Sequence, residues 1–194
     1  METTEERTGR ASPMTPDDRR AAIIDAVAPL VMEHGRAITS REIAEAAGVA
    51  EGTVFRAFGD KDTLIDAVIE KLLDPEPFRD AMRGVDPAEP LERKMADIIR
   101  LLQGRFAGVM GVMRAIGREG GTPPAPTKFV ERVVHVLEPD LDRLAVPAED
   151  VAHLLRLVAF ASAIRPLNQE REFTVDELAA FVSRGIAARP LPEN

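Results

Sequence analysis

Polar side chains suited to contacting nucleic-acid bases are concentrated in residues 39–61, TSREIAEAAGVAEGTVFRAFGDK. The guanidinium groups of Arg41 and Arg56 can each donate two hydrogen bonds to the O6 and N7 atoms of a guanine. Glu51 can accept a hydrogen bond from a cytosine amino group, and Thr53 offers both a hydroxyl and a methyl group. The chemistry of this segment is therefore hydrogen bonding to base edges, provided that a helix presents these residues together.

The same segment predicts two short helices separated by a tight turn. Thr39 and Glu42 have the spacing of a capping box, which predicts a helix that begins at about Ser40. Gly48 can adopt the left-handed conformation that ends a helix, and a second helix is expected from Glu51. Apolar residues occupy the inward-facing positions, namely Ile43, Ala44, Ala47, Val49, Val54 and Phe58. This spacing is that of a helix-turn-helix, which places its second helix in the major groove of DNA.

Twelve residues at fixed spacing form one pattern: Thr39, Ile43, Ala44, Ala47, Gly48, Val49, Gly52, Thr53, Phe55, Phe58, Lys61 and Leu64. With this pattern, residues 16–73 resemble the TetR family of bacterial transcriptional regulators. The resemblance implies a sequence-specific DNA-binding regulator, most simply a repressor that leaves its operator when a small molecule binds. It also implies which residues face DNA: Ser40, Arg41, Glu51, Gly52, Thr53, Phe55, Arg56 and Ala57, with Lys61 on a phosphate.

Three departures from the family pattern remove a side chain that caps the second helix and side chains that contact phosphate. Ala50 stands where the family often has a capping serine, Phe55 replaces a tyrosine, and Ala57 replaces a frequent histidine. The charge balance acts in the same direction, because the chain has a formal net charge of −8, and residues 1–75 contain nine Lys/Arg against fifteen Asp/Glu. We therefore expect weak non-specific binding and a greater reliance on base contacts.

The whole chain is predicted to be all-α, with three parts. Residues 1–14 are expected to form a flexible arm, residues 15–74 the helix-turn-helix domain with its linking fourth helix, and residues 75–194 a helical ligand-binding and dimerisation domain. Pro29 interrupts the first predicted helix and predicts a local distortion there. A proline pair at 75 and 77 ends the fourth helix.

The C-terminal part is expected to bind a largely apolar small molecule and to form a homodimer. The candidate pocket residues are Met95, Ile99, Leu102, Phe106, Met110, Met113, Phe129, Val133 and Phe160. The candidate dimer residues on the last two helices are Leu154, Leu155, Val158, Leu178, Phe181 and Val182. A dimer predicts a near-palindromic operator, since two reading helices about 34 Å apart meet successive major-groove half-sites.

Two alternatives remain open at this point. The first is a constitutive helix-turn-helix protein without small-molecule control, which a core without a cavity between residues 91 and 165 would favour. The second is a helical enzyme, but the sequence has no nucleophile, phosphate-binding or dinucleotide motif, and His135 and His153 lack a completed set of metal ligands. We expect no enzyme activity, no cofactor and no metal. The absence of cysteine and of a long apolar segment predicts a cytoplasmic protein with no membrane contact.

Overall fold

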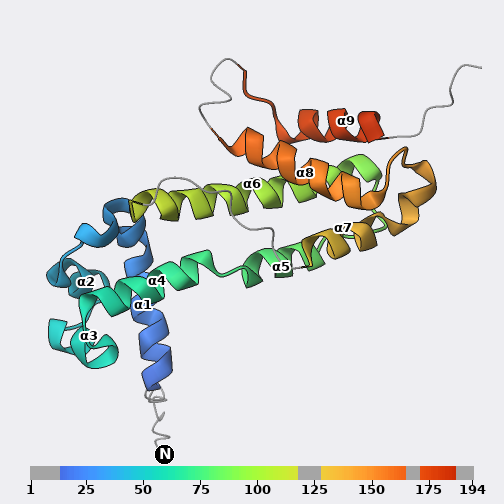
Figure 1. The fold of residues 1–194 in the computed structure, drawn as a ribbon. Coiled ribbons are helices and arrows are strands. Elements are labelled where there is room, and N and C mark those ends of the chain that lie inside the picture. Colours follow the sequence, from blue (N-terminus) through green and yellow to red (C-terminus); the bar gives the residue numbers. More distant parts are fainter. Residues whose placement is uncertain (1–13, 118–127, 165–170, 187–194) are drawn as a thin grey trace, which may run out of the picture. The chain divides into compact units, whose positions relative to one another are not determined.

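The computed structural model of the chain describes residues 14–117, 128–164 and 171–186, and within these ranges it is all-α (Figure 1). The chain divides into two compact units, Met1–Lys71 and Leu72–Asn194. The helices of the first unit are α1 (Pro16–His34), the short 3-10 helix η1 (Gly35–Ala37), α2 (Ser40–Ala46), α3 (Glu51–Phe58) and α4 (Lys61–Leu73), whose last two residues lie beyond the division. The arm expected at residues 1–14 lies outside the described residues, apart from Met14.

Capping boxes mark the starts of α1 and α2 in the first unit. Thr15 and Asp18 form a capping box at the start of α1, with Asp18 N–H donating to Thr15 Oγ1 at 3.1 Å. The predicted capping box of α2 is confirmed, since Thr39 N–H donates to Glu42 Oε2 at 2.8 Å and Glu42 N–H donates to Thr39 Oγ1 at 3.3 Å. Helix α1 includes Pro29 in its interior and continues to His34.

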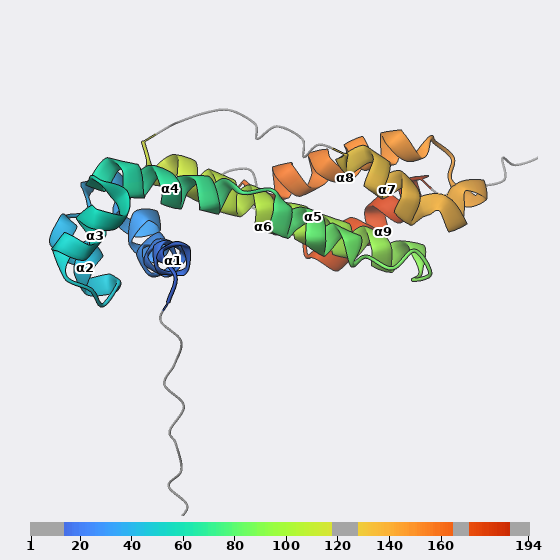
Figure 2. The same ribbon diagram turned by 90° about the horizontal axis from the view of Figure 1, so that it is seen from below.

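The second unit is built around one long helix. Its elements are α5 (Glu76–Arg83), α6 (Leu91–Ala115), α7 (Phe129–Leu137), the 3-10 helix η2 (Glu138–Arg143), α8 (Ala148–Ala163) and α9 (Val175–Ile186). Helix α6 packs against both α8 and α9, and α7 packs against α8 (Figures 1 and 2). Burial of the apolar stripes of these helices forms a single hydrophobic cluster. Among the described residues, no helix combines the length and the apolar composition that crossing a membrane requires.

Two helices of the second unit run through residues that disfavour helices. Helix α5 occupies a segment that its prolines predicted to be a break, because Pro77 lies in the first turn, where a missing N–H costs no hydrogen bond. Helix α6 is continuous over 25 residues despite three glycines. The apolar stripe of α6, buried against two neighbouring helices, outweighs the low helix propensity of those glycines.

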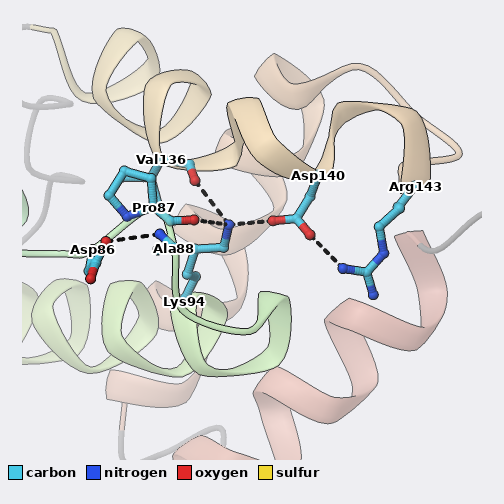
Figure 3. A network of polar contacts seen from close by, with 7 residues as sticks. All are labelled: Asp86, Pro87, Ala88, Lys94, Val136, Asp140 and Arg143. Atoms are coloured by element: carbon cyan, nitrogen blue, oxygen red, sulfur yellow. Dashed lines mark hydrogen bonds and ion pairs between the residues drawn. The ribbon is translucent and has the colours of Figure 1, made fainter.

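A buried lysine joins three segments of the second unit (Figure 3). The side chain of Lys94 is 1% exposed and forms an ion pair with Asp140, which is 5% exposed as a residue. The Lys94 ammonium also donates to the carbonyl oxygens of Pro87 at 2.9 Å and Val136 at 3.1 Å. Arg143 donates to the other Asp140 oxygen at 2.6 Å. Each of the three N–H groups of Lys94 therefore has an acceptor, which a buried ammonium requires.

Replacing Lys94 should destabilise the second unit strongly. We expect Lys94→Met to lower the free energy of unfolding by about 3–5 kcal/mol, because Asp140 loses its buried cation and two carbonyl groups lose their donor. The double variant Lys94→Met/Asp140→Leu should recover part of that loss. Arg143→Met is the matched control, since Arg143 binds the same carboxylate from an exposed position and should cost about 0–1 kcal/mol. Urea unfolding followed by circular dichroism measures all three, and equal losses for Lys94→Met and Arg143→Met would contradict the assignment.

Candidate nucleic-acid interface

The turn between α2 and α3 is held by main-chain hydrogen bonds and one left-handed glycine. Gly48 has a φ of 63°, as its predicted role requires, and Val49 N–H donates to the carbonyl of Ala44 at 3.0 Å. Ala50 precedes α3 without a side-chain cap, so Thr53 N–H is satisfied by the Ala50 carbonyl at 2.8 Å. The turn therefore fixes the direction of α3 through the backbone rather than through side chains.

Helix α3 buries one face and exposes the other. Val54 and Phe58 are buried, whereas Phe55 is 44% exposed. The remaining predicted contact residues of α3 are exposed at Glu51, Gly52 and Arg56 and half-buried at Thr53 and Ala57. On α2, Arg41 is exposed and Ser40 half-buried. Eight of the predicted contact residues thus lie on two adjacent short helices with at least part of each side chain accessible.

The cations of the first unit fall into two groups. Arg36 pairs with Asp66 and lies 3.8 Å from Asp62, and Lys71 pairs with Asp25, so these cations offset carboxylates of their own unit. Arg41 and Arg56 have no carboxylate partner within the described ranges, although Arg56 Nε donates to the Gly52 carbonyl at 3.0 Å. Arg41 and Arg56 on the predicted reading surface are thus among the cations of this unit that form no ion pair with a described carboxylate.

Arg20 on α1 contacts α3 through Phe58, which lies on the buried side of α3. Its guanidinium carbon lies 5.1 Å from the centre of the Phe58 ring, a cation–π distance.

Lys61 has a role that the sequence did not indicate. Its ammonium donates to the carbonyl oxygens of Arg36 at 3.2 Å and Ile38 at 3.1 Å, so it ties the start of α4 to the segment between α1 and α2. The adjacent Asp60 caps α4 by accepting from Thr63 N–H at 2.7 Å, and this hydrogen bond lowers the pKa of Asp60. In the same way, hydrogen bonds from Thr39 lower the pKa of Glu42. Lysine spacing alone could not distinguish a phosphate contact from this internal one.

The residues expected to line an effector pocket lie mostly in the core. Six of the nine belong to the buried cluster of the second unit: Met95, Ile99, Leu102, Phe106, Phe129 and Val133. Phe160 packs against that cluster, with its ring at 5.2 Å from the Phe106 ring, and Met110 and Met113 are half-buried. An open groove of about 760 Å³ lies instead between α5 and α7, and it shares only Phe129 with the expected set.

The residues expected at a dimer interface divide into exposed and internal ones. Leu154 is 38% exposed and Phe181 is 54% exposed, whereas Leu155 and Val182 are buried in the core of their own chain. Val158 and Leu178 are half-buried. Leu157, which is not among the residues expected at the interface, is 67% exposed. Helical periodicity identified α8 and α9 as apolar helices. It did not show which apolar residues of each helix pack in the core of their own chain and which are exposed.

The histidines do not gather metal ligands in the part of the chain that the structure describes. His135 Nδ1 lies 3.3 Å from Glu138 Oε2 on the surface, and no cluster of three potential ligands occurs among the described residues.

Comparisons with known proteins agree on one family. Residues 23–68 match the family described as "Bacterial regulatory proteins, tetR family". The HTH-type transcriptional repressor Rv3405c of Mycobacterium tuberculosis is 31% identical over 184 residues, which cover 92% of this chain and 92% of that protein. A TetR transcription regulator from Haloarcula marismortui is 20% identical with a TM-score of 0.58, over 89% of this chain and 100% of that chain. The structure of superantigen PfiT gives a TM-score of 0.59 at 16% identity, over 89% and 98% of the two chains, and at such identities the likeness concerns the fold alone.

The internal role of Lys61 makes a prediction about stability. We expect Lys61→Met to lower the free energy of unfolding of the first unit by about 1–2 kcal/mol, because two carbonyl groups lose a charged donor. Lys71→Met is the control, since its ion pair with Asp25 is exposed and should contribute less than about 1 kcal/mol. Thermal unfolding reports the overall change, and hydrogen exchange at residues 35–39 reports the local one. Unchanged exchange there in Lys61→Met would show that the ammonium does not hold this segment.

Proposed function

The chain belongs to the TetR family of bacterial transcriptional regulators, and on that premise we propose that it is a homodimeric repressor released from its operator by a small molecule. The observation that carries the proposal is the accessible face of α2 and α3, which combines base-reading side chains with two arginines unmatched by carboxylates. The protein would act on chromosomal DNA in the cytoplasm. The relative from Mycobacterium tuberculosis is itself described as a repressor, which supports this sign of regulation.

In the proposed complex, α3 enters the major groove. Arg56 and Arg41 would donate to guanine, Glu51 would accept from cytosine, and Thr53 would contact either a polar edge or a thymine methyl group. Gly52 permits close backbone approach, and Ser40, Phe55 and Ala57 complete the surface. Lys61 retains one N–H beyond its two carbonyl contacts, and that N–H would be its donor to a phosphate.

A second copy of the chain is the proposed cover for the exposed apolar face of α8 and α9. On α8, Leu154, Leu157 and Val158 follow a helical spacing of three and four residues, so they lie on one side of the helix. On α9, Leu178 and Phe181 have the same spacing. The side chains of Leu157 and Phe181 are each more than half exposed, which is costly for residues of this size in an isolated chain. A symmetric dimer would bury both helices and place two reading helices on successive half-sites.

Coupling between ligand and DNA would pass through α4. The last carbonyls of this helix accept hydrogen bonds from Arg105 of α6, to Leu73 at 2.6 Å and to Asp74 at 3.0 Å. A ligand that shifts α5 or α6 would therefore change the support of the end of α4, the helix whose other end carries Lys61. The proposal is a two-state one, in which the ligand favours the conformation that fits DNA less well.

Selection of bound duplexes from a random library tests the DNA-binding part. We expect the wild-type dimer to recover a near-palindromic site at low and moderate salt. Arg41→Ala should flatten the preference at one position of each half-site and cost roughly 1–3 kcal/mol on the selected site, because a base contact is lost. Arg114→Ala, an exposed arginine of the second unit, is the control. If folded, dimeric protein selects no preferred sequence, the proposal of sequence-specific DNA binding is wrong.

Charge insertion on the apolar face tests the dimer. We expect Leu157→Glu and Phe181→Glu to give monomers by sedimentation velocity and to lose the selected operator, because two carboxylates would face each other across a desolvated interface. Met32→Glu, which changes an exposed apolar residue of α1, should leave the dimer intact. If Leu157→Glu and Phe181→Glu remain dimers, the interface lies on another surface.

A further inference from the structure

The groove between α5 and α7 has an apolar floor. Phe78 and Met82 of α5 and Phe129 of α7 line it, and each is no more than 8% exposed. The rings of Phe78 and Phe129 lie 6.4 Å apart at an angle of 38°, so the two helices meet through aromatic packing. The volume of about 760 Å³ is within the range of small-molecule sites, which is about 300–1,000 Å³.

The rim of the same groove is cationic. Four basic side chains line it, Arg79, Arg83, Lys128 and Arg132, against two carboxylates, Glu76 and Glu131. The surplus of positive charge is local, because the chain as a whole has a formal net charge of −8. Of these cations, Arg79 pairs with Glu76 and Arg83 with Asp80 along α5. Lys128 and Arg132 have no carboxylate partner among the residues that the structure describes.

Arg132 is held rigidly and still has donors to spare. Its Nε donates to the Met82 carbonyl at 3.0 Å, and its Nη2 donates to the carbonyls of Arg83 at 2.9 Å and Val85 at 3.2 Å. These bonds satisfy the end of α5 and fix the guanidinium plane, while the two N–H groups of Nη1 have no acceptor within the described ranges. A guanidinium fixed in this way is preorganised for an anion, because its orientation has already been set by folding.

Lys128 supplies a second, accessible cation at the start of α7. The residue is exposed and has a φ of 66°, the left-handed conformation. No hydrogen bond of its ammonium occurs within the described part of the chain. Lys128 directly precedes α7 and Arg132 lies in the first turn of that helix, and both line the groove beside the apolar floor that Phe129 contributes.

We propose that this groove is the effector site and that its ligand is a small amphipathic anion, with an acidic group on an apolar body. This inference rests on the proposed function, since it names the ligand class of the regulatory unit. It differs from the largely apolar effector and the core pocket expected from the sequence. An anionic group would accept from Arg132 Nη1 and Lys128, and the body would cover Phe78, Met82 and Phe129.

The charge of the rim selects against other ligand classes. A cationic ligand would be repelled by the surplus of basic groups. A neutral apolar ligand would displace water from Arg132 and Lys128 and offer no hydrogen-bond acceptor in its place. An anion removes both costs, because each covered cation gains a charged acceptor.

Isothermal titration of the full-length dimer with matched acids and amides tests the proposal. The probes are decanoate against decanamide and 2-naphthoate against 2-naphthamide, which keep the body and change only the charge. We expect at least one acid to bind about tenfold more tightly than its amide, with affinity that falls as salt rises. Equal binding of acid and amide in both pairs, or no binding by either acid, would overturn the proposal.

Variants of the rim locate the site. Lys128→Asn removes the charge while keeping a residue that tolerates the left-handed conformation, and it should weaken the bound acid about tenfold. Arg114→Gln, an exposed arginine outside the groove, is the matched control and should change nothing. If Arg114→Gln weakens the acid as much as Lys128→Asn, the acid is held by general electrostatics and the groove is not its site.

Operator binding measured without ligand separates this proposal from the proposed function. If the wild-type dimer holds its selected operator but binds no acid, the ligand class is wrong while the regulator stands. If the acid binds in the groove but no operator is recovered, the anion site stands and sequence-specific repression fails.

Discussion

The last carbonyl oxygens of a helix have no N–H donor within that helix. In this protein, long cationic side chains donate hydrogen bonds to several of these carbonyl oxygens. Lys61 donates to the carbonyls of Arg36 and Ile38, and Arg105 donates to those at the end of α4. Lys94 and Arg132 do the same for the ends of α7 and α5. Each of these donors comes from a different helix than its acceptors, so satisfying the carbonyls also fixes how neighbouring helices are connected within each unit.

This use of cations has a consequence for binding DNA. The first unit is acidic, and its Arg36 and Lys71 are already paired with carboxylates. Arg41 and Arg56 on the proposed reading surface have no such partner among the described residues. A surface with so few available cations gains little from the phosphate backbone, whose attraction is independent of sequence. In the proposed complex, base contacts would then provide a larger share of the affinity.

The second unit presents two surfaces of different character. The face of α8 and α9 that carries Leu157 and Phe181 is apolar, which suits a second copy of the same chain. The groove between α5 and α7 combines an apolar floor with unbalanced positive charge, which suits a smaller and charged partner. Because Arg132 both closes the end of α5 and lines this groove, a ligand there would act on a helix that follows α4 directly in the chain. The two surfaces therefore allow dimerisation and ligand binding without competition for the same residues.

The sequence by itself determined the helix-turn-helix, its caps, its glycine turn and the all-α class, because capping boxes and helical periodicity depend on residues only three or four positions apart. Only the tertiary structure decided the rest. It showed that Lys61 binds carbonyls within its own unit, that Leu155 and Val182 point inward while Leu157 points out, and that α5 is a helix that forms one wall of a charged groove. These properties depend on which segments distant in sequence meet, and a local pattern contains no information about that choice.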